Sequence, residues 1–484
     1  MASHTNETQN SLSEPMSSFE EQEQGEGKKY IVPLSPNSQY LHSKALSLGV
    51  IIVFESEIPI NDSKQFEVLR ELLLPVNPRF SSILVRDEKG VQYWKKVEVN
   101  LKDHVKVPRF PEGLTPSTYE AHLHKYLGQI AMEPFEDEKP LWEVHIFKYP
   151  TVDASGTVLF KLHHALGDGF SLMGALFSCL KRADDPTLPL TFPPASKFKF
   201  KREKNVWKRV SKAVAGIWNT SYDVSQSVLK STVVEDGRSG IRSGHEGIES
   251  LPVAFARVVL SLERIREVKI KVGGTVNDVV SGVMFYGIHL YNKRMGQTSQ
   301  HMTSLVLLNS KMINGYQSIQ EMLETRSWGN NFTFIQVSIP SCENVDEVNP
   351  LIFISKASAI IKKKRNSLEV FIIGILLKTL RKIRGYEAVS RYIYETLQNT
   401  TLTITNLIGP KEKIQIGNHP VKNFYFFVTG APQSLGTMVV SYMGKLTIAL
   451  ILEEGFVDSQ LLVSCINDAF ERIYQVAMGR AGVV

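Results

Sequence analysis

Two adjacent histidines followed by a Gly-Asp-Gly turn are the residues of this sequence best suited to acid–base chemistry. They lie in the segment Leu162-His163-His164-Ala165-Leu166-Gly167-Asp168-Gly169. Imidazole takes up a proton near neutral pH because its ordinary pKa is about 6.5. A histidine here could therefore remove the proton of a hydroxyl group, which is a poor nucleophile until a base acts on it.

A strand and a helix must hold these histidines in place. The apolar residues 157–162 predict a strand, and residues 169–180 predict a helix with one apolar face. Side chains alternate along a strand, so we expect His163 and His164 to point to opposite sides, one toward a channel and one into packing. Glycine at positions 167 and 169 lets the chain turn sharply and bring the helix close.

Two other interpretations of the histidine pair are a metal site and a purely structural role. Adjacent strand residues diverge, and the sequence shows no cluster of His, Cys, Asp or Glu that supplies a compact third ligand. We therefore expect no metal. From these residues alone, buried structural histidines remain an alternative.

Composition limits the class of protein. The 484 residues are 43% hydrophobic and 21% charged, which fits a globular chain of two or three domains. The net charge of +6 suits an anionic substrate or an acidic lipid surface and does not require nucleic acid. The longest apolar run, residues 370–377, is shorter than the roughly 18–20 residues that span a bilayer, and predicts a buried core helix.

The chain divides into four parts. Residues 1–29 are rich in Ser, Glu and Gln and predict a disordered tail, residues 30–190 a first domain, and residues 251–484 a second. Residues 191–250 form a basic crossover that contains Trp207 and Trp218. This crossover is either a solvated linker or an interfacial helix whose cations meet anionic headgroups. Both large parts mix strands with helices, which indicates an α/β fold.

Local signals also predict where several helices begin. Spacings typical of a capping box place helix starts at Ser117 and Thr275, and a last helix is expected over residues 458–478. Short strands are expected at 46–54, 82–85, 93–99, 142–147, 255–260, 304–308, 332–339, 402–406, 424–428, 438–442 and 445–451.

The histidine segment resembles the HHxxxDG motif of CoA-dependent acyltransferases. From about Tyr30 to its end, the chain resembles the plant wax ester synthase/diacylglycerol acyltransferase family. The stretches that carry this resemblance are, in order, 33–36 with 39–40, 77–82, 140–143, 277–278, 328–330, 406–410 and 441–444. The chain departs from the family pattern at Asn309-Ser310, where a basic residue is missing, and it lacks the DFGWG signature of soluble BAHD acyltransferases.

The resemblance implies an α/β fold of two chloramphenicol-acetyltransferase-like domains with a channel between them. It implies an O-acyltransferase that moves a fatty acyl group from acyl-CoA, a co-substrate, to a long-chain fatty alcohol, with diacylglycerol as a further acceptor and no cofactor. The alternatives are a mainly diacylglycerol acyltransferase activity and a catalytically silent, membrane-associated lipid-binding protein. The expected location is the cytosolic face of the endoplasmic reticulum membrane, or the plasma membrane.

The resemblance also implies roles for single residues. His164 is the expected base, His163 supports the packing of the motif, and Asp168 holds the turn through a salt bridge. The residues expected to contact substrate are Gly169, Asn277, Asp278 and Asn406. For Asn277 the alternative is a hydrogen bond within its own helix turn, and for Asn406 it is the shaping of a loop with Gly409-Pro410.

Overall fold

The computed structural model describes residues 31–88, 90–192, 234–297, 301–309, 328–330, 332–342, 344–365 and 369–479. The predicted tail, 1–29, and residues 193–233 of the predicted crossover lie outside these described residues. No helix in the described ranges combines the length and the apolar character that crossing a membrane requires.

The first large sheet is built around one fully buried strand, β2 (Gly49–Ser56). Residues 49–54 of this strand form a continuous apolar run because both faces of the sheet are covered at this position. The strands lie in the order β5 (Val105–Lys106), β6 (Trp142–Phe147), β7 (Gly156–His163), β2, β14 (His419–Thr429), β13 (Ile414–Ile416) and β8 (Lys181–Arg182). The helices of this half are α1 (Pro36–Tyr40), α2 (Gln65–Val68), α3 (Leu101–His104), α4 (Pro116–Met132) and α5 (Gly169–Cys179).

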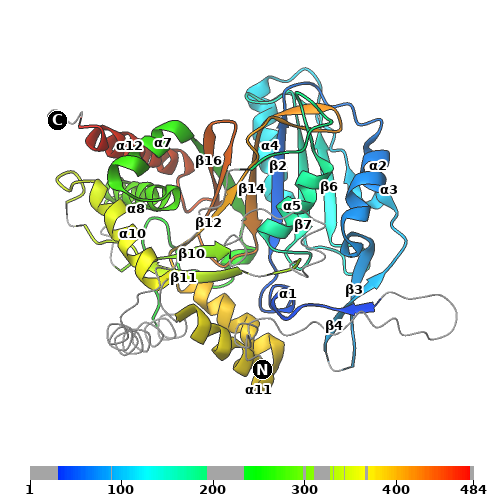
Figure 1. Ribbon diagram of the computed structural model, residues 1–484, viewed down its shortest axis with the longest axis horizontal. Coiled ribbons are helices and arrows are strands. Elements are labelled where there is room, and N and C mark those ends of the chain that lie inside the picture. Colours follow the sequence, from blue (N-terminus) through cyan, green and yellow to red (C-terminus); the bar gives the residue numbers. More distant parts are fainter. Residues whose placement is uncertain are drawn as a thin grey trace, which may run out of the picture.

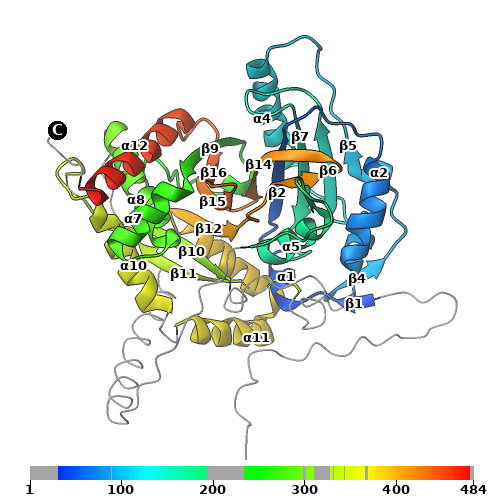
Figure 2. The same cartoon turned by 45° about the horizontal axis from the view of Figure 1, so that its top comes forward.

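The second large sheet mixes parallel and antiparallel pairs. Its order is β11 (Phe332–Ser338), β10 (Thr303–Asn309), β12 (Leu402–Ile408), β15 (Leu435–Tyr442), β16 (Lys445–Glu453) and β9 (Val253–Ser261). Helices α7 (Leu262–Val272), α8 (Val276–Arg294), α10 (Leu351–Arg365) and α12 (Ser459–Ala477) gather on its outer side, as Figures 1 and 2 show. Helix α11 (Glu369–Gln398) contacts α10, the edge strand β11 and, in the first half, α1. A small sheet of β1 (Ile31–Pro33), β4 (Gln92–Lys96) and β3 (Ser82–Arg86) completes the first half.

The two sheets do not follow the division of the sequence at residue 251. Strand β14 comes from the second half of the chain, yet it pairs along its length with β2 of the first sheet, with Phe424 opposite Phe54. Strands β12 and β15, which come before β13 and after β14 in sequence, pair with each other in the second sheet. The first sheet is therefore completed by β14 and β13 from the second half of the chain, whereas the strands of the second sheet all come from residues 253–453.

Most predicted elements are present, but two details were wrong. Helix α4 is capped by Thr115, whose hydroxyl accepts from the Thr118 N–H, and not by Ser117. Pro116 explains the earlier start because proline is favoured at the first helical position. The run 370–377 was expected to be a buried core helix. It belongs to α11, and its Ile375 is 49% exposed.

An ion cluster around the buried carboxylate of Glu55 joins the two halves. Arg257 on β9 contacts the carboxylates of Glu55 on β2 and of Asp153. Glu55 is only 3% exposed, and it also accepts hydrogen bonds from Tyr425 and Asn423 at 3.0 Å each. A charge buried this deeply is tolerated only while it keeps its partners.

Arg257→Ala should lower the free energy of unfolding by about 3 kcal/mol, because it leaves the Glu55 charge buried without its cation. Urea unfolding measures this loss. The control is Arg294→Ala, which breaks an exposed pair with Asp468 and should cost less than about 1 kcal/mol. Equal losses in the two variants would contradict the role of the cluster.

Candidate active site

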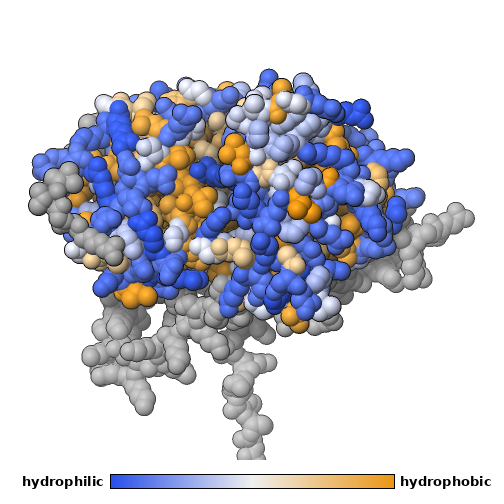
Figure 3. All heavy atoms as spheres, turned by 90° about the horizontal axis from the view of Figure 1, so that it is seen from above, coloured by the Kyte–Doolittle hydropathy of each residue, from blue (hydrophilic) through white to orange (hydrophobic). Residues whose placement is uncertain are grey.

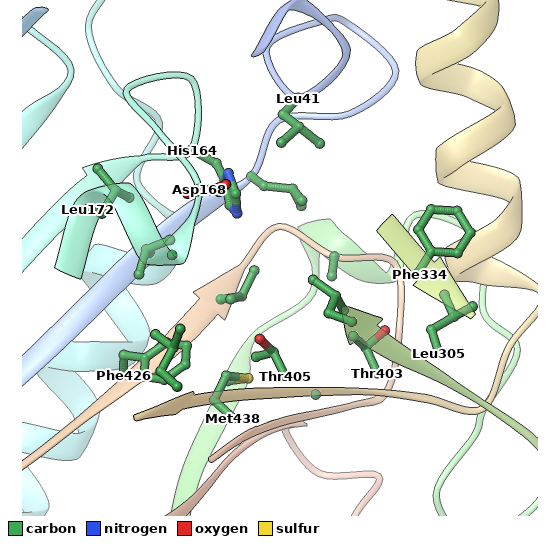
Figure 4. Close-up of a pocket in the computed structure, with 18 of the residues that line it drawn as sticks. Leu41, His164, Asp168, Leu172, Leu305, Phe334, Thr403, Thr405, Phe426 and Met438 are labelled. Carbon is green, nitrogen blue, oxygen red and sulfur yellow. The ribbon is translucent and has the colours of Figure 1, made fainter. Parts of the chain in front are cut away.

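An apolar cavity of about 110 Å³ lies between the two sheets. The first half contributes residues of β2 and α5 and the segment before β2, and the second half contributes residues of β10, β11, β12, β15 and α11. Figure 4 shows Leu41, Leu172, Phe334 and Phe426 around this space, with His164 beside Asp168 at one side. Apart from His164 and Asp168, the polar residues of the lining are Thr403, Thr405 and Gln433.

His164 follows directly after β7 and lines this cavity. Its backbone N–H donates to the carbonyl of Leu48 at 2.9 Å, so the adjacent strand β2 fixes where the residue sits. The residue is 8% exposed. The ring is therefore neither walled off nor turned to bulk solvent, which satisfies the first requirement for a base in this cavity.

Asn330, which comes from the other half of the chain, fixes the proton on the His164 ring. Its Oδ1 lies 2.9 Å from His164 Nδ1, and its Nδ2 donates to the His164 carbonyl and to Ser38 Oγ, both at 2.8 Å. Since Nδ2 faces two acceptors, Oδ1 must face the ring, and Nδ1 must carry the hydrogen. The lone pair is then on Nε2, the nitrogen that can act as the base.

The two residues before Asn330 hold the turn after the histidines. Trp328 Nε1 donates to the carbonyl of Leu166 at 3.0 Å, and the Gly329 carbonyl accepts from Ser171 Oγ at 3.1 Å. Gly329 has a φ of 130°, a conformation that favours glycine because it has no Cβ. Residues 328–330 were noted in the sequence only as a stretch that resembles the family; the structure adds them to the site.

Burial sets the charge of His164. Removal from water lowers the pKa of the ring below its ordinary 6.5, and this effect outweighs the opposing effects of Asp168, the residue's own carbonyl and Asn330. The imidazole is therefore neutral at pH 7 and able to accept a proton.

His163 has a different environment, as alternation along the strand predicts. Its Nδ1 accepts from the Ala165 N–H at 2.9 Å, and its Nε2 lies 3.0 Å from Ser47 Oγ. Burial, followed by the nearby His42, lowers its pKa well below 6.5. Both ring nitrogens are thus engaged inside the protein, and the ring packs edge-on against Phe135. This geometry suits support of the motif and not proton transfer to a substrate.

Asp168 and Gly169 lie at the start of α5 and line the cavity. Asp168 Oδ1 accepts from the Ser171 N–H at 2.8 Å and so caps the helix. This bond, inside the turn, fixes the step from strand to helix; the salt bridge expected for Asp168 stays a prediction. Gly167 is required for close packing, because a Cβ there would lie 2.9 Å from Ser171 Cβ.

Asn277, Asp278 and Asn406 lie on the other side of β12. Thr405 and Leu407 of this strand line the cavity, so Asn406 between them points to the opposite face, where its Nδ2 donates to Asn277 Oδ1. Asp278 closes the capping box of α8 with Thr275 and accepts from Ser358 Oγ at 3.1 Å. These residues are not part of the described cavity lining, and their contact with substrate stays a prediction.

Among the described residues, no group of three or more His, Cys, Asp or Glu side chains is placed to hold a metal ion. The site can support proton transfer to a neutral imidazole that faces an apolar space.

Two protein-family models match this chain. The wax ester synthase/diacylglycerol acyltransferase catalytic domain matches residues 42–280, and the WS/DGAT C-terminal domain matches residues 328–474. These two models of one family span most of the chain. The protein belongs to the wax ester synthase/diacylglycerol acyltransferase family.

Relatives and solved structures agree with this membership. Wax ester synthase/diacylglycerol acyltransferase 4 of Arabidopsis thaliana is 28% identical and covers 89% of this chain and 87% of its own; number 11 of the same plant is also 28% identical, with 86% and 89% covered. The wax ester synthase/diacylglycerol acyltransferase of Marinobacter aquaeolei VT8 has a TM-score of 0.59 at 16% identity, covering 92% of this chain and 100% of that one. The trichothecene 15-O-acetyltransferase TRI3 of Fusarium sporotrichioides has a TM-score of 0.54 at 11% identity, with 93% and 95% covered. The predicted fold class is thereby confirmed.

The lowered pKa of His164 predicts how kcat/KM for ester formation by this protein depends on pH. The base must be deprotonated, so activity is lost only as pH falls through the pKa of the folded site. Because burial places that pKa below 6.5, the acid limb of kcat/KM for ester formation should lie below pH 6.5. Stopped assays with a soluble acyl-CoA across pH 5 to 8 measure it, and an acid limb above pH 7 would contradict this assignment.

Asn330→Asp should move that acid limb to higher pH, because a carboxylate beside Nδ1 stabilises the protonated ring. Asn330→Ala should lower kcat by about tenfold or more by releasing the ring from its orientation. Asn467→Asp, which adds the same charge on the exposed face of α12, is the control and should leave the profile in place. If both Asn330 variants keep the wild-type pH profile and kcat, the role of Asn330 in orienting the His164 ring is contradicted.

Proposed function

We propose that the protein is an O-acyltransferase that moves a fatty acyl group from acyl-CoA to the hydroxyl of a long-chain fatty alcohol to form a wax ester, with diacylglycerol as a second acceptor. The observation that carries this proposal is the position of His164, whose Nδ1 lies 2.9 Å from Asn330 Oδ1 and whose side chain stands in the wall of an apolar cavity. Family membership supplies the reaction class.

The reaction needs one base and an apolar site. His164 Nε2 removes the hydroxyl proton as the alcohol oxygen attacks the thioester carbonyl carbon of acyl-CoA. The tetrahedral intermediate collapses with cleavage of the carbon–sulfur bond, and the leaving thiolate takes the proton back from the His164 imidazolium. The ester and free CoA are the products, and His164 returns to its neutral state.

The lining of the cavity supports a long alkyl chain as the acceptor. Leucine, isoleucine, valine, methionine and phenylalanine side chains provide most of its surface, and an alkyl chain gains free energy by leaving water for such a space. The threonines and Gln433 offer hydrogen-bond partners for a second hydroxyl or an ester group, which supports diacylglycerol as the further acceptor.

The complete set of contacts around His164 weighs against a silent lipid-binding protein. Binding alone does not require the base to be neutral or its Nδ1 proton to be held by a partner from the other half of the chain. The lipid character of both acceptors supports a location at a membrane surface, which we propose to be the cytosolic face of the endoplasmic reticulum, with the plasma membrane as the second candidate.

His164→Ala should lower kcat/KM for ester formation by roughly 10²–10⁴, because it removes the general base. Purified protein with an unchanged unfolding midpoint is required for the comparison. His245→Ala, a substitution of an exposed histidine outside the cavity, is the matched control. Near-normal activity of folded His164→Ala protein would refute the assignment.

The preferred acceptor can be read from the lipids of a yeast strain that lacks its own neutral-lipid synthesis. Cells that express the protein should make wax ester only when fatty alcohol is supplied, because the alcohol is the acceptor. Triacylglycerol without wax ester would make diacylglycerol the main acceptor. Neither product in cells that contain folded protein would contradict the proposed function.

A further inference from the structure

Gly385 divides helix α11 into two segments. We infer that the first segment, which ends before Gly385, docks the protein onto the surface of an anionic lipid bilayer. The α11 surface consists of Ile375, Lys378, Lys382, Ile383 and Arg384. The inference deepens the proposed function, since it names the surface from which lipid substrates would reach the cavity.

Three residues of the exposed α11 surface share one side of the helix, whereas Ile383 lies about a quarter turn from them and Arg384 stands at the end of the segment, before Gly385. Ile375, Lys378 and Lys382 follow each other at intervals of three and four residues and therefore lie on one side of the helix. Ile375 is 49% exposed and Ile383 is 75% exposed. Single exposed apolar residues are common on protein surfaces. Two of them among exposed cations form the combination typical of helices that lie in a membrane interface.

Charge along this segment has one sign. Residues 370–386 contain Lys378, Arg381, Lys382 and Arg384 and no Asp or Glu. The preceding helix α10 ends in a further basic run, residues 362–365. Anionic headgroups attract such clusters, while the aliphatic side chains of Ile375 and Ile383 can enter the boundary between headgroups and acyl chains.

The inner side of α11 connects the α11 surface with the cavity. Leu377 and Leu380 pack against an apolar cluster in which Tyr40, Leu41, Leu46 and Leu48 meet Val389, Tyr392 and Ile393 of the second segment of α11. Leu41 and Leu48 line the cavity, as do Ile393 and Leu397 from the second segment of the same helix. One helix thus carries the α11 surface and part of the cavity wall.

Gly385 allows α11 to serve both roles. Its φ of 82° and ψ of −175° interrupt the helix between the two segments, in a conformation that favours glycine.

In Figures 1 and 2, α11 lies along the lower edge of the molecule, away from the helices α7, α8 and α12 that cover the second sheet. The face seen from above in Figure 3 is mainly hydrophilic, with hydrophobic residues gathered on the side of the second sheet.

The test uses the full-length protein and flotation with vesicles of phosphatidylcholine with or without phosphatidylserine. Wild type should bind the vesicles that contain phosphatidylserine. Lys378→Gln, Lys382→Gln and Arg384→Gln together should weaken binding at least about tenfold, because each cation near an anionic surface contributes several-fold. Ile375→Ser with Ile383→Ser should weaken binding to the same vesicles at unchanged charge.

Helix α7 offers a matched control. Its Ile270 is 75% exposed, like Ile383, and stands between Lys269 and Lys271 with Arg266 one turn before. Ile270→Ser, combined with glutamine at the three cationic positions, changes the same residue types elsewhere on the surface. This variant should bind vesicles like wild type. Equal loss in the α7 and α11 variants would overturn the inference, as would wild-type binding by both α11 variants.

Activity separates this inference from the proposed function. With acyl-CoA and alcohol dispersed in detergent, the α11 variants should form ester at the wild-type rate, because none of the substituted residues lines the described cavity. With alcohol embedded in anionic vesicles, their rate should fall at least about tenfold along with binding. Absence of ester formation by wild type under both conditions would contradict the proposed function, whereas equal rates of wild type and α11 variants on vesicles would contradict the docking surface alone.

Discussion

The side-chain amide of Asn330 is the interaction on which the site depends. It contacts both the ring and the backbone carbonyl of His164, so it sets the position of the proton and the position of the residue together. It also ties the second half of the chain to Ser38 in the first. A base in water would lack a fixed tautomer; here the pairing of the two halves creates it. The active form of the imidazole is thus a property of the assembled fold, and neither half could provide it alone.

Much of the fold was predictable from local patterns, and the reason is physical. Residues 157–162 and 169–180 carry the apolar periodicity of a strand and a helix, and the structure has β7 and α5 at these places. The capping box at Thr275 also marks the start of α8. Signals of this kind act over a few residues and can be read without tertiary structure. At Ser117 the same reasoning failed, because Pro116 sets the first turn of α4.

The parts that could not be predicted depend on contacts between distant residues. Asn330 and His164 are separated by 166 positions, and nothing in the local sequence of either indicates the other. The same holds for β14, whose pairing with β2 crosses from one half to the other. Asn406 shows a third case: its neighbours Thr405 and Leu407 line the cavity, and strand alternation turns its own side chain toward α8. A motif places such a residue near a site without telling which side of the sheet it faces.

The pairing of β14 from the second half with β2 from the first has a consequence for synthesis of the chain. During translation β2 emerges early, but its partner at residues 419–429 emerges only near the end. Until then one edge of a mainly apolar strand has no backbone partner, and such an edge invites pairing with other chains. Truncation shortly before residue 419 therefore leaves this edge of β2 without its strand partner and should yield insoluble material and not a smaller soluble domain.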